Sequence, residues 1–175
     1  PEPDSCHCAH CQARFRRFLE ERYPDAEAQR RRFGFAGLDH FRAPNFYLRF
    51  TNPWDIERFA NPLMRDWIDF RCQTVTDYIS DLAAYARDLK PDIAIDSNAQ
   101  SIWGVNQSLI HGVRHDHQVP VVDAFWEENP DSKEPSPEVP DTSRKLRGML
   151  LGRRMGKPVM TSFANADDLA WNLTF

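Results

Sequence analysis

The clearest pattern of apolar positions predicts a long helix over residues 62–89. Its apolar side chains are spaced alternately four and three residues apart, which is typical of one face of an α-helix. They are Ile68, Cys72, Val75, Ile79, Leu82, Ala86 and Leu89. Asn61 suits the N-cap and Pro62 the first helical position, where its missing N–H costs no hydrogen bond. Cys72 lies on the apolar stripe, where a cysteine behaves as a small hydrophobic side chain.

A short strand is predicted directly after this helix, within the helix–strand unit 62–98. Its body holds two isoleucines, and its last three residues are Asp96, Ser97 and Asn98. Polar residues at the carboxyl ends of parallel strands form the active-site rim of open α/β sheets and (β/α)₈ barrels. The alternative is that these polar residues only satisfy backbone groups of the following loop.

Two more strands are predicted downstream, one at 119–128 and one at the end of a helix–strand unit at 142–163. The helix has Leu146, Met149 and Leu150 on its apolar face. Between them, residues 129–141 hold four prolines and are too long for a tight turn, so this segment is a candidate lid.

The beginning of the chain is less regular. Residues 1–23 combine a cysteine cluster with a helix whose apolar face includes Phe15 and Leu19. Residues 24–61 are rich in aromatic residues, glycine and proline, which predicts a long loop. Its rings either pack on the scaffold or provide stacking platforms for a sugar.

Strands that alternate with helices indicate parallel pairing and right-handed crossovers. Three strands cannot close an eight-stranded barrel, which needs about 250 residues. The predicted fold class is therefore α/β, as part of a (β/α)₈ barrel or as a small open sheet.

Composition limits the functional classes. The chain has 175 residues, of which 41% are hydrophobic, and this favours a globular domain. A net charge of −4, from 26 acidic and 22 basic residues, gives no nucleic-acid footprint. No apolar run is long enough to predict a membrane span.

The chain begins with Pro1 and has no signal-like segment, so we expect an internal piece of a longer protein. The clustered cysteines slightly favour a cytoplasmic location over an oxidising compartment.

The cysteine cluster carries the most specific chemistry in the chain. Cys6, Cys8 and Cys11 offer three thiolates, with His7 and His10 beside them. A structural zinc site needs four such ligands, so the fourth is upstream, a histidine, or absent. The alternative is three reduced thiols without a metal.

A second group of histidines is not expected to bind a metal. His111, His115 and His117 surround Asp116 without a ligand spacing that fits a helix or strand, so we interpret them as solvated loop residues.

One stretch of the chain resembles a known family. Residues 6–24 are similar to the Cys-x-Cys-x-x-Cys-x-x-x-Phe-Arg segment that follows the fourth barrel strand in glycoside hydrolase family 42. They are equally similar to the hypothetical glycosyl hydrolases related to that family. The later order also resembles it, with Trp67 opening the long helix and the strand Asp123–Glu128 following the one that ends at Asn98. The resemblance covers residues 6–163 and implies a TIM barrel, from just after strand four to about strand seven.

The resemblance implies a mechanism with two carboxylic acids. The family's general acid would lie upstream of Pro1, and residues 157–165 have no glutamate where the family has its nucleophile on strand seven. Glu127 and Glu128 are the best remaining candidates for a catalytic carboxylate. The resemblance favours Glu128, and the alternative is that both open a surface loop.

The strand pattern adds substrate contacts to this hypothesis. Asp123 and Glu127 would share one face of the strand, with Trp126 and Glu128 on the other. Asp96, Asn98 and Asp123 are expected to bind substrate, with Trp126 as a ring that stacks on a sugar.

We therefore expect a fragment of a glycoside-hydrolase domain. The full-length protein would hydrolyse O-glycosidic bonds in carbohydrate with paired carboxylates, and the fragment would be inactive by itself. The alternative is a non-catalytic, zinc-stabilised α/β module that binds carbohydrate or a protein partner. A homo-oligomer is compatible with either prediction.

Overall fold

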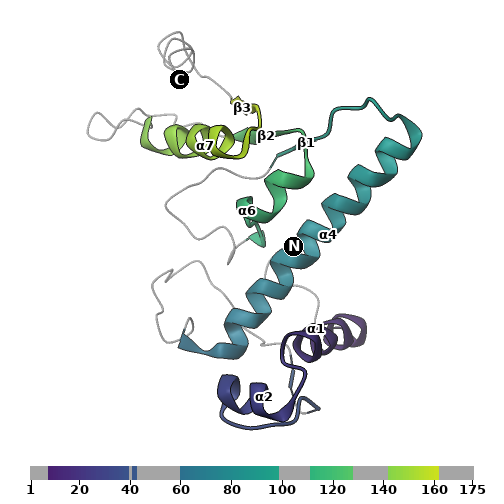
Figure 1. The fold of residues 1–175 in the computed structure, drawn as a ribbon, viewed down its shortest axis with the longest axis vertical. Coiled ribbons are helices and arrows are strands. Elements are labelled where there is room, and N and C mark those ends of the chain that lie inside the picture. Colours follow the sequence, from purple (N-terminus) through teal and green to yellow (C-terminus); the bar gives the residue numbers. More distant parts are fainter. Residues whose placement is uncertain (1–7, 40, 43–59, 99–110, 128–141, 162–175) are drawn as a thin grey trace. The chain divides into compact units, whose positions relative to one another are not determined.

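The computed structural model describes residues 8–39, 41–42, 60–98, 111–127 and 142–161 (Figure 1). The chain divides into two compact units, which are residues 1–74 with 108–112 and residues 75–107 with 113–175. In chain order the described elements are α1 (Ala9–Arg22), α2 (Ala26–Phe33), α4 (Pro62–Leu89), β1 (Asp96–Ser97), α6 (His115–Gln118), the 3₁₀ turn η1 (Val119–Val121), β2 (Ala124–Glu127), α7 (Thr142–Met155) and β3 (Val159–Thr161).

Aromatic side chains form the core of the first unit, between α1 and the first part of α4. Phe15 and Leu19 on α1 are fully buried, as is Trp67 on α4. The Phe15 ring lies edge-on to Trp67 with centroids 5.0 Å apart, and 5.3 Å from the ring of Phe70. Such edge-to-face pairs add to the stabilisation that burial provides. The predicted apolar face of the first helix is confirmed at Phe15 and Leu19.

The long helix α4 starts where its capping residues predict. The side-chain oxygen of Asn61 accepts hydrogen bonds from the backbone N–H of Leu63 at 2.9 Å and of Met64 at 3.4 Å. These bonds satisfy N–H groups that have no partner within the helix. Cys72 is fully buried in the core of the first unit, as predicted.

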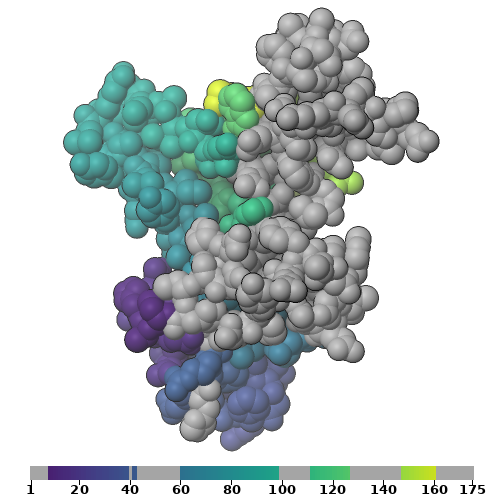
Figure 2. All heavy atoms as spheres, turned by 180° about the vertical axis from the view of Figure 1, so that it is seen from behind, coloured from purple at the N-terminus to yellow at the C-terminus, as the bar shows by residue number. Residues whose placement is uncertain are grey.

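The predicted apolar stripe of α4 is buried in the first part of the helix but not at its end. Leu82 and Leu89 are 49% and 70% exposed, whereas Ala83 is buried. A stripe spaced by alternating fours and threes repeats every 3.5 residues, and a straight α-helix drifts by about 20° per heptad from that repeat. Over 28 residues the drift turns the end of the stripe towards solvent. Figure 2 shows this second part of α4 (teal) at the surface.

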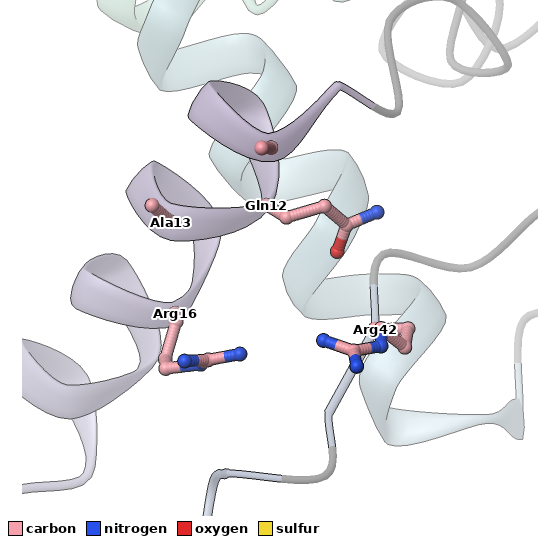
Figure 3. Close-up of a pocket in the computed structure, with 5 residues that line it drawn as sticks. Gln12, Ala13, Arg16 and Arg42 are labelled. Carbon is pink, nitrogen blue, oxygen red and sulfur yellow. The ribbon is translucent and has the colours of Figure 1, made fainter.

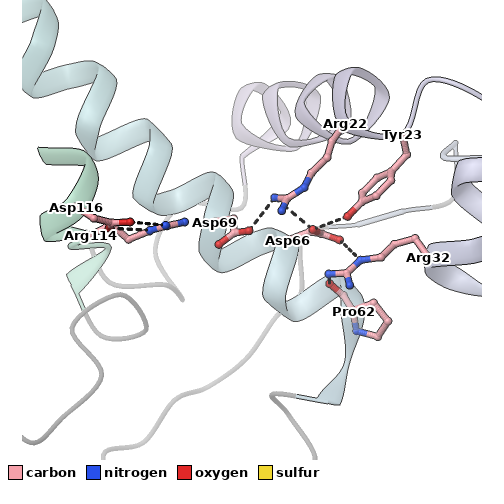
Figure 4. Close-up of polar contacts among 8 residues, drawn as sticks. All are labelled: Arg22, Tyr23, Arg32, Pro62, Asp66, Asp69, Arg114 and Asp116. Atoms are coloured by element: carbon pink, nitrogen blue, oxygen red, sulfur yellow. Dashed lines mark hydrogen bonds and ion pairs between the residues drawn. The ribbon is translucent and has the colours of Figure 1, made fainter.

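A buried carboxylate joins three helices of the first unit (Figure 4). Asp66 on α4 has no exposed side-chain surface. It accepts hydrogen bonds from the Tyr23 hydroxyl at 3.0 Å and from Nε of Arg32 at 3.0 Å, and Nη1 of Arg22 lies 3.5 Å from it. Arg32 also donates to the backbone oxygen of Pro62 at 3.1 Å. The network connects the end of α1 and the end of α2 to the first turns of α4.

The loop predicted over residues 24–61 contains a helix, α2, which is a correction. Asp25 caps it by accepting a hydrogen bond from the N–H of Ala28 at 2.7 Å. Gly34, at φ 84°, ends it in the left-handed conformation that glycine adopts without strain. The helix is short and mostly polar, so no apolar periodicity signals it. Residues 43–59 of the predicted loop lie outside the described residues.

Among the described residues of the second unit, three parallel strands form a sheet in the order β1-β2-β3. Ser97 pairs with Phe125, and Phe125 pairs with Val159. Phe125 is fully buried with Val119 and Val122, and these side chains pack against a larger apolar set. That set comprises Ile79, Ile95, Val121, Leu151, Met155 and Val159. The order and direction of the strands confirm the predicted α/β class.

The strands are shorter than predicted. β1 covers only two residues of the helix–strand unit that ends at Asn98. Within 119–128 the strand begins at Ala124, because Val119–Val121 form a 3₁₀ turn with Pro120 in its first turn. Proline cannot donate to a strand ladder, so this start is displaced towards the end of the segment.

Helix α7 lies against the sheet with a different face from the one predicted. Leu150 is 54% exposed, whereas Leu151 and Met155 pack on the core. A side chain at Gly152 would meet Val159 and lie 2.9 Å from the backbone oxygen of Lys157. Gly152 therefore allows α7 to approach β3 closely, a role that an apolar pattern does not reveal.

The Asp66 network generates a first prediction. Replacing Asp66 by Asn should lower the free energy of unfolding by about 2–4 kcal/mol, because it removes the charge that pairs with two arginines at a fully buried position. Asp69→Asn is the matched control, since this carboxylate pairs with Arg22 at 2.7 Å but is 32% exposed. It should cost less than about 1 kcal/mol. Urea unfolding of the full-length protein measures both, and equal losses would contradict the assignment.

Candidate active site at the carboxyl edge of the sheet

The carboxyl ends of the three parallel strands share one edge of the sheet. Glu127 ends β2 and pairs in register with Thr161, which ends β3. Asn98 directly follows β1 and is exposed. Open α/β sheets and barrels bind their ligands at this edge. The structure thus brings the ends of the predicted site segments together, while Glu128 lies outside the described residues.

The two faces of the sheet differ in burial. Phe125 is fully buried on the face that carries the core. Its neighbour Trp126 points to the opposite face, since successive strand residues alternate, and it is half-buried. Trp126 pairs in register with Met160, which is 36% exposed. Within the described residues the Trp126 face is therefore the less buried one.

Asp96 lies at the start of β1, level with Ala124 of β2. Burial raises the pKa of the Asp96 carboxyl, and the hydrogen bond from the Ser97 backbone partly offsets this effect. A raised pKa means that the surroundings disfavour the charged form, which is common near ligand sites. Its role in binding substrate stays a prediction.

Asp123 lies at the opposite end of β2 from Glu127, just before Ala124. Its Oδ2 atom accepts two hydrogen bonds. One comes from the Ile95 N–H at 2.8 Å and the other from Nη2 of Arg87 at 2.8 Å. The Ile95 hydrogen bond first, and Arg87 second, hold the pKa of Asp123 below its ordinary value. These contacts tie the end of α4 and the entry to β1 to the entry to β2. They favour a structural role, and the predicted contact with substrate is untested.

Two of the three predicted zinc ligands lie at the start of α1. Cys8 is the N-cap residue and Cys11 lies in the first turn, three residues on. This spacing places both on one side of the helix. No disulfide forms among the described cysteines, which are Cys8, Cys11 and Cys72. The described ranges hold no group of three metal-ligating side chains, but Cys6 lies outside them, so the three-thiolate site is untested.

In the second histidine group, Asp116 pairs with Arg114. Arg114 donates two hydrogen bonds to Asp116, at 2.8 and 3.3 Å (Figure 4). The hydrogen bond from Arg114 lowers the pKa of the Asp116 carboxyl. His115 and His117 are half-buried in α6, so they are less solvated than predicted. Because Arg114 occupies Asp116, the arrangement gives no support to a metal site.

Comparison with known families adds a decisive observation. Residues 2–172 match the family model of glycoside hydrolase family 42, whose description is beta-galactosidase. The chain belongs to glycoside hydrolase family 42. This membership confirms the family resemblance of the sequence.

A solved structure shows the same fold. The crystal structure of beta-galactosidase from Bacillus circulans sp. alkalophilus matches 84% of this chain, with a TM-score of 0.58 and 17% identity. The match covers 21% of that chain, so this family 42 chain spans about a fifth of its length. The comparison with curated proteins gave no match. The three parallel strands are therefore part of a TIM barrel, as predicted.

One further finding concerns membranes. Among the helices that the structure describes, none is both long enough and apolar enough to cross a bilayer.

The Asp123 contacts predict a pH-dependent contribution to stability. A carboxylate whose pKa is lowered on folding stabilises the fold above its ordinary value of 3.8. That contribution is lost as the pH falls through the lowered pKa of the folded state. Asp123→Asn should therefore unfold at a lower urea concentration than the wild type at pH 7, and the difference should shrink towards pH 3.

Asp92→Asn is the control for this prediction, because Asp92 is an exposed turn residue. It should leave the urea midpoint unchanged at both values of pH. A midpoint difference for Asp123→Asn that is the same at pH 7 and pH 3 would contradict a stabilising charge at this position.

Proposed function

We propose that the protein containing this family 42 chain hydrolyses O-glycosidic bonds in carbohydrate, with a carboxylate at the end of β2 as one of two catalytic groups. The observation that carries the proposal is the position of Glu127. It ends the central strand of a parallel sheet, at the edge where TIM barrels hold their catalytic residues. Membership of a glycosidase family supports the reaction class.

The mechanism uses the two carboxylic acids in different protonation states. One donates a proton to the oxygen of the leaving sugar, and the other attacks the anomeric carbon or activates a water. This chain provides one of them in the proposal, and the family resemblance implies that the partner precedes Cys6. The separation of the two groups would decide whether the configuration is retained or inverted.

Alternation along the strand favours Glu128 over Glu127. Phe125 points into the core, so continued strand alternation would turn position 127 to the same side and position 128 to the side of Trp126. A catalytic carboxylate of a TIM barrel must point away from the helix-covered side, towards the mouth of the barrel at the carboxyl edge. We therefore assign the catalytic role to Glu128, with Glu127 as the second candidate.

The remaining site residues have supporting roles in the proposal. Trp126 offers an aromatic face on the more open side of the sheet, which suits stacking on a sugar ring. Asn98, exposed beside the end of β1, and Asp96 would form hydrogen bonds to sugar hydroxyl groups. Asp123 is the weakest of the substrate-binding predictions, because both of its described contacts are internal to the fold.

Carboxylate substitutions test this assignment. Glu128→Gln should lower turnover of an aryl galactoside by the full-length protein by at least about a hundredfold, because the amide cannot exchange a proton or attack. Glu127→Gln should have a smaller effect. Glu21→Gln, an exposed change on α1, is the control. Turnover that stays within about a hundredfold of wild type in both strand variants would overturn the assignment.

We also propose that Cys6, Cys8 and Cys11 hold a structural zinc ion. The position of Cys8 and Cys11 on one side of the first turn of α1 supports this, because two thiolates at that spacing can reach one ion. When bound, the zinc would brace the start of α1 and take no part in bond cleavage. The fourth ligand would come from outside the described residues.

Metal analysis tests the zinc proposal separately from catalysis. The purified full-length protein should contain about one equivalent of zinc, and Cys8→Ser or Cys11→Ser should reduce it below about half an equivalent. Cys72→Ala is the matched control and should keep its zinc, since Cys72 lies in the apolar core of the first unit. Less than about half an equivalent in the wild type would contradict the proposal.

A further inference from the structure

A cavity of about 420 Å³ lies in the first unit, beside the first half of α1 (Figure 3). Four of its lining residues repeat at the i, i+3, i+4 and i+7 positions of one helix face. The lining consists of Ala9, Gln12, Ala13 and Arg16 from α1, with Arg42 facing them. This volume lies in the range of small-molecule sites.

Two guanidinium groups converge on this cavity. Figure 3 shows Arg16 and Arg42 pointing towards each other from opposite walls, with the Gln12 amide directed into the same opening. Both groups carry a positive charge, so an anion between them would be attracted from two sides. Among the described residues no carboxylate forms an ion pair with either arginine.

The Arg16 side chain carries a second signal. Its Nε atom is buried and has no hydrogen-bond partner within the described part of the chain. Buried donors are nearly always paired in folded proteins. Here, no contact of Nε within the described fold occupies the Arg16 guanidinium. The end of a guanidinium presents two Nη–H groups side by side, and this fork binds two oxygens of an oxyanion.

The residue before Arg42, Phe41, is packed in the first unit. The backbone N–H of Phe41 donates to the oxygen of Leu38 at 3.0 Å, and Leu38 is buried in the core of the first unit. The Phe41 ring also lies 4.7 Å from that of Phe33, between centroids. The backbone at Arg42 therefore follows packed residues, while the Arg42 side chain itself is exposed.

We propose that this cavity binds the phosphate group of a small molecule. Two guanidinium forks on opposite walls match a tetrahedral dianion, whose oxygens can accept from both sides at once. A single planar carboxylate presents only one edge to a fork. Ala9 and Ala13 leave room on the α1 wall for the uncharged part of the ligand. The site involves neither the sheet edge nor the cysteines, so it stands independently of the proposed glycosidase activity.

Calorimetric titration of the full-length protein with inorganic phosphate tests the proposal. At low ionic strength the wild type should bind with a Kd of about 1 mM or tighter, and acetate, a single carboxylate, should bind at least about tenfold more weakly. Arg16→Gln and Arg42→Gln should each weaken phosphate binding at least about tenfold, and Arg16→Lys should also weaken it, because lysine keeps the charge but loses the fork. Glycerol phosphate in a parallel titration distinguishes a phosphate ester from the free ion, and tighter binding of either one supports the site.

Arg14→Gln is the matched control, since Arg14 is exposed on the same helix and does not line the cavity. It should bind phosphate like the wild type. Unfolding midpoints without phosphate show whether each variant is folded, and exposed Arg42 gives a variant that does not disturb buried packing. Three results would each overturn the proposal: no saturable binding by the wild type, equal loss in Arg14→Gln, or acetate binding as tight as phosphate.

Discussion

The packing of the first unit depends on a single buried charge, the carboxylate of Asp66. A carboxylate without solvent exposure is strongly unfavourable unless its oxygens are paired and hydrogen-bonded. Here Tyr23 and Arg32 supply hydrogen bonds and Arg22 an additional charge, so three helices must hold their ends together around it. Burial, and then the hydrogen bond with Asp66, also raise the pKa of the Tyr23 hydroxyl, so it holds its proton more firmly than a free tyrosine does.

The second unit also depends on a paired carboxylate, that of Asp123. Its desolvation penalty is smaller than that of Asp66, because Asp123 remains partly in water. Asp123 joins Arg87 near the end of α4 to the Ile95 backbone just before β1. The link holds the amino-terminal edge of the sheet, while the candidate catalytic residue lies beyond the carboxyl end of β2. Such a division, with stability at one edge and chemistry at the other, is the general plan of TIM barrels.

Periodicity and capping could predict the long elements from the sequence but not the polar links between them. The Asn61 cap and the apolar spacing of α4 are local signals, so that helix was predictable. The pairing of Asp66 with Arg32 joins residues 34 positions apart, and no local pattern encodes it. Helix α2 was missed because its stability comes from capping and that pairing more than from an apolar face. At the candidate site the strand order was predictable, whereas the choice between Glu127 and Glu128 depends on a pleat that the apolar pattern alone does not fix.

The central claim is that a glutamate at the end of β2 is a catalytic group of a family 42 glycosidase. Affinity labelling of the full-length protein with a galactose-derived epoxide tests it most directly, since an active-site carboxylate opens the epoxide and forms a stable ester. Peptide mass spectrometry should then find the label on the peptide that contains Glu127 and Glu128, at Glu128, and free galactose should protect it. A label whose formation galactose prevents and that lies on another carboxylate, with Glu127 and Glu128 unmodified, would contradict the account.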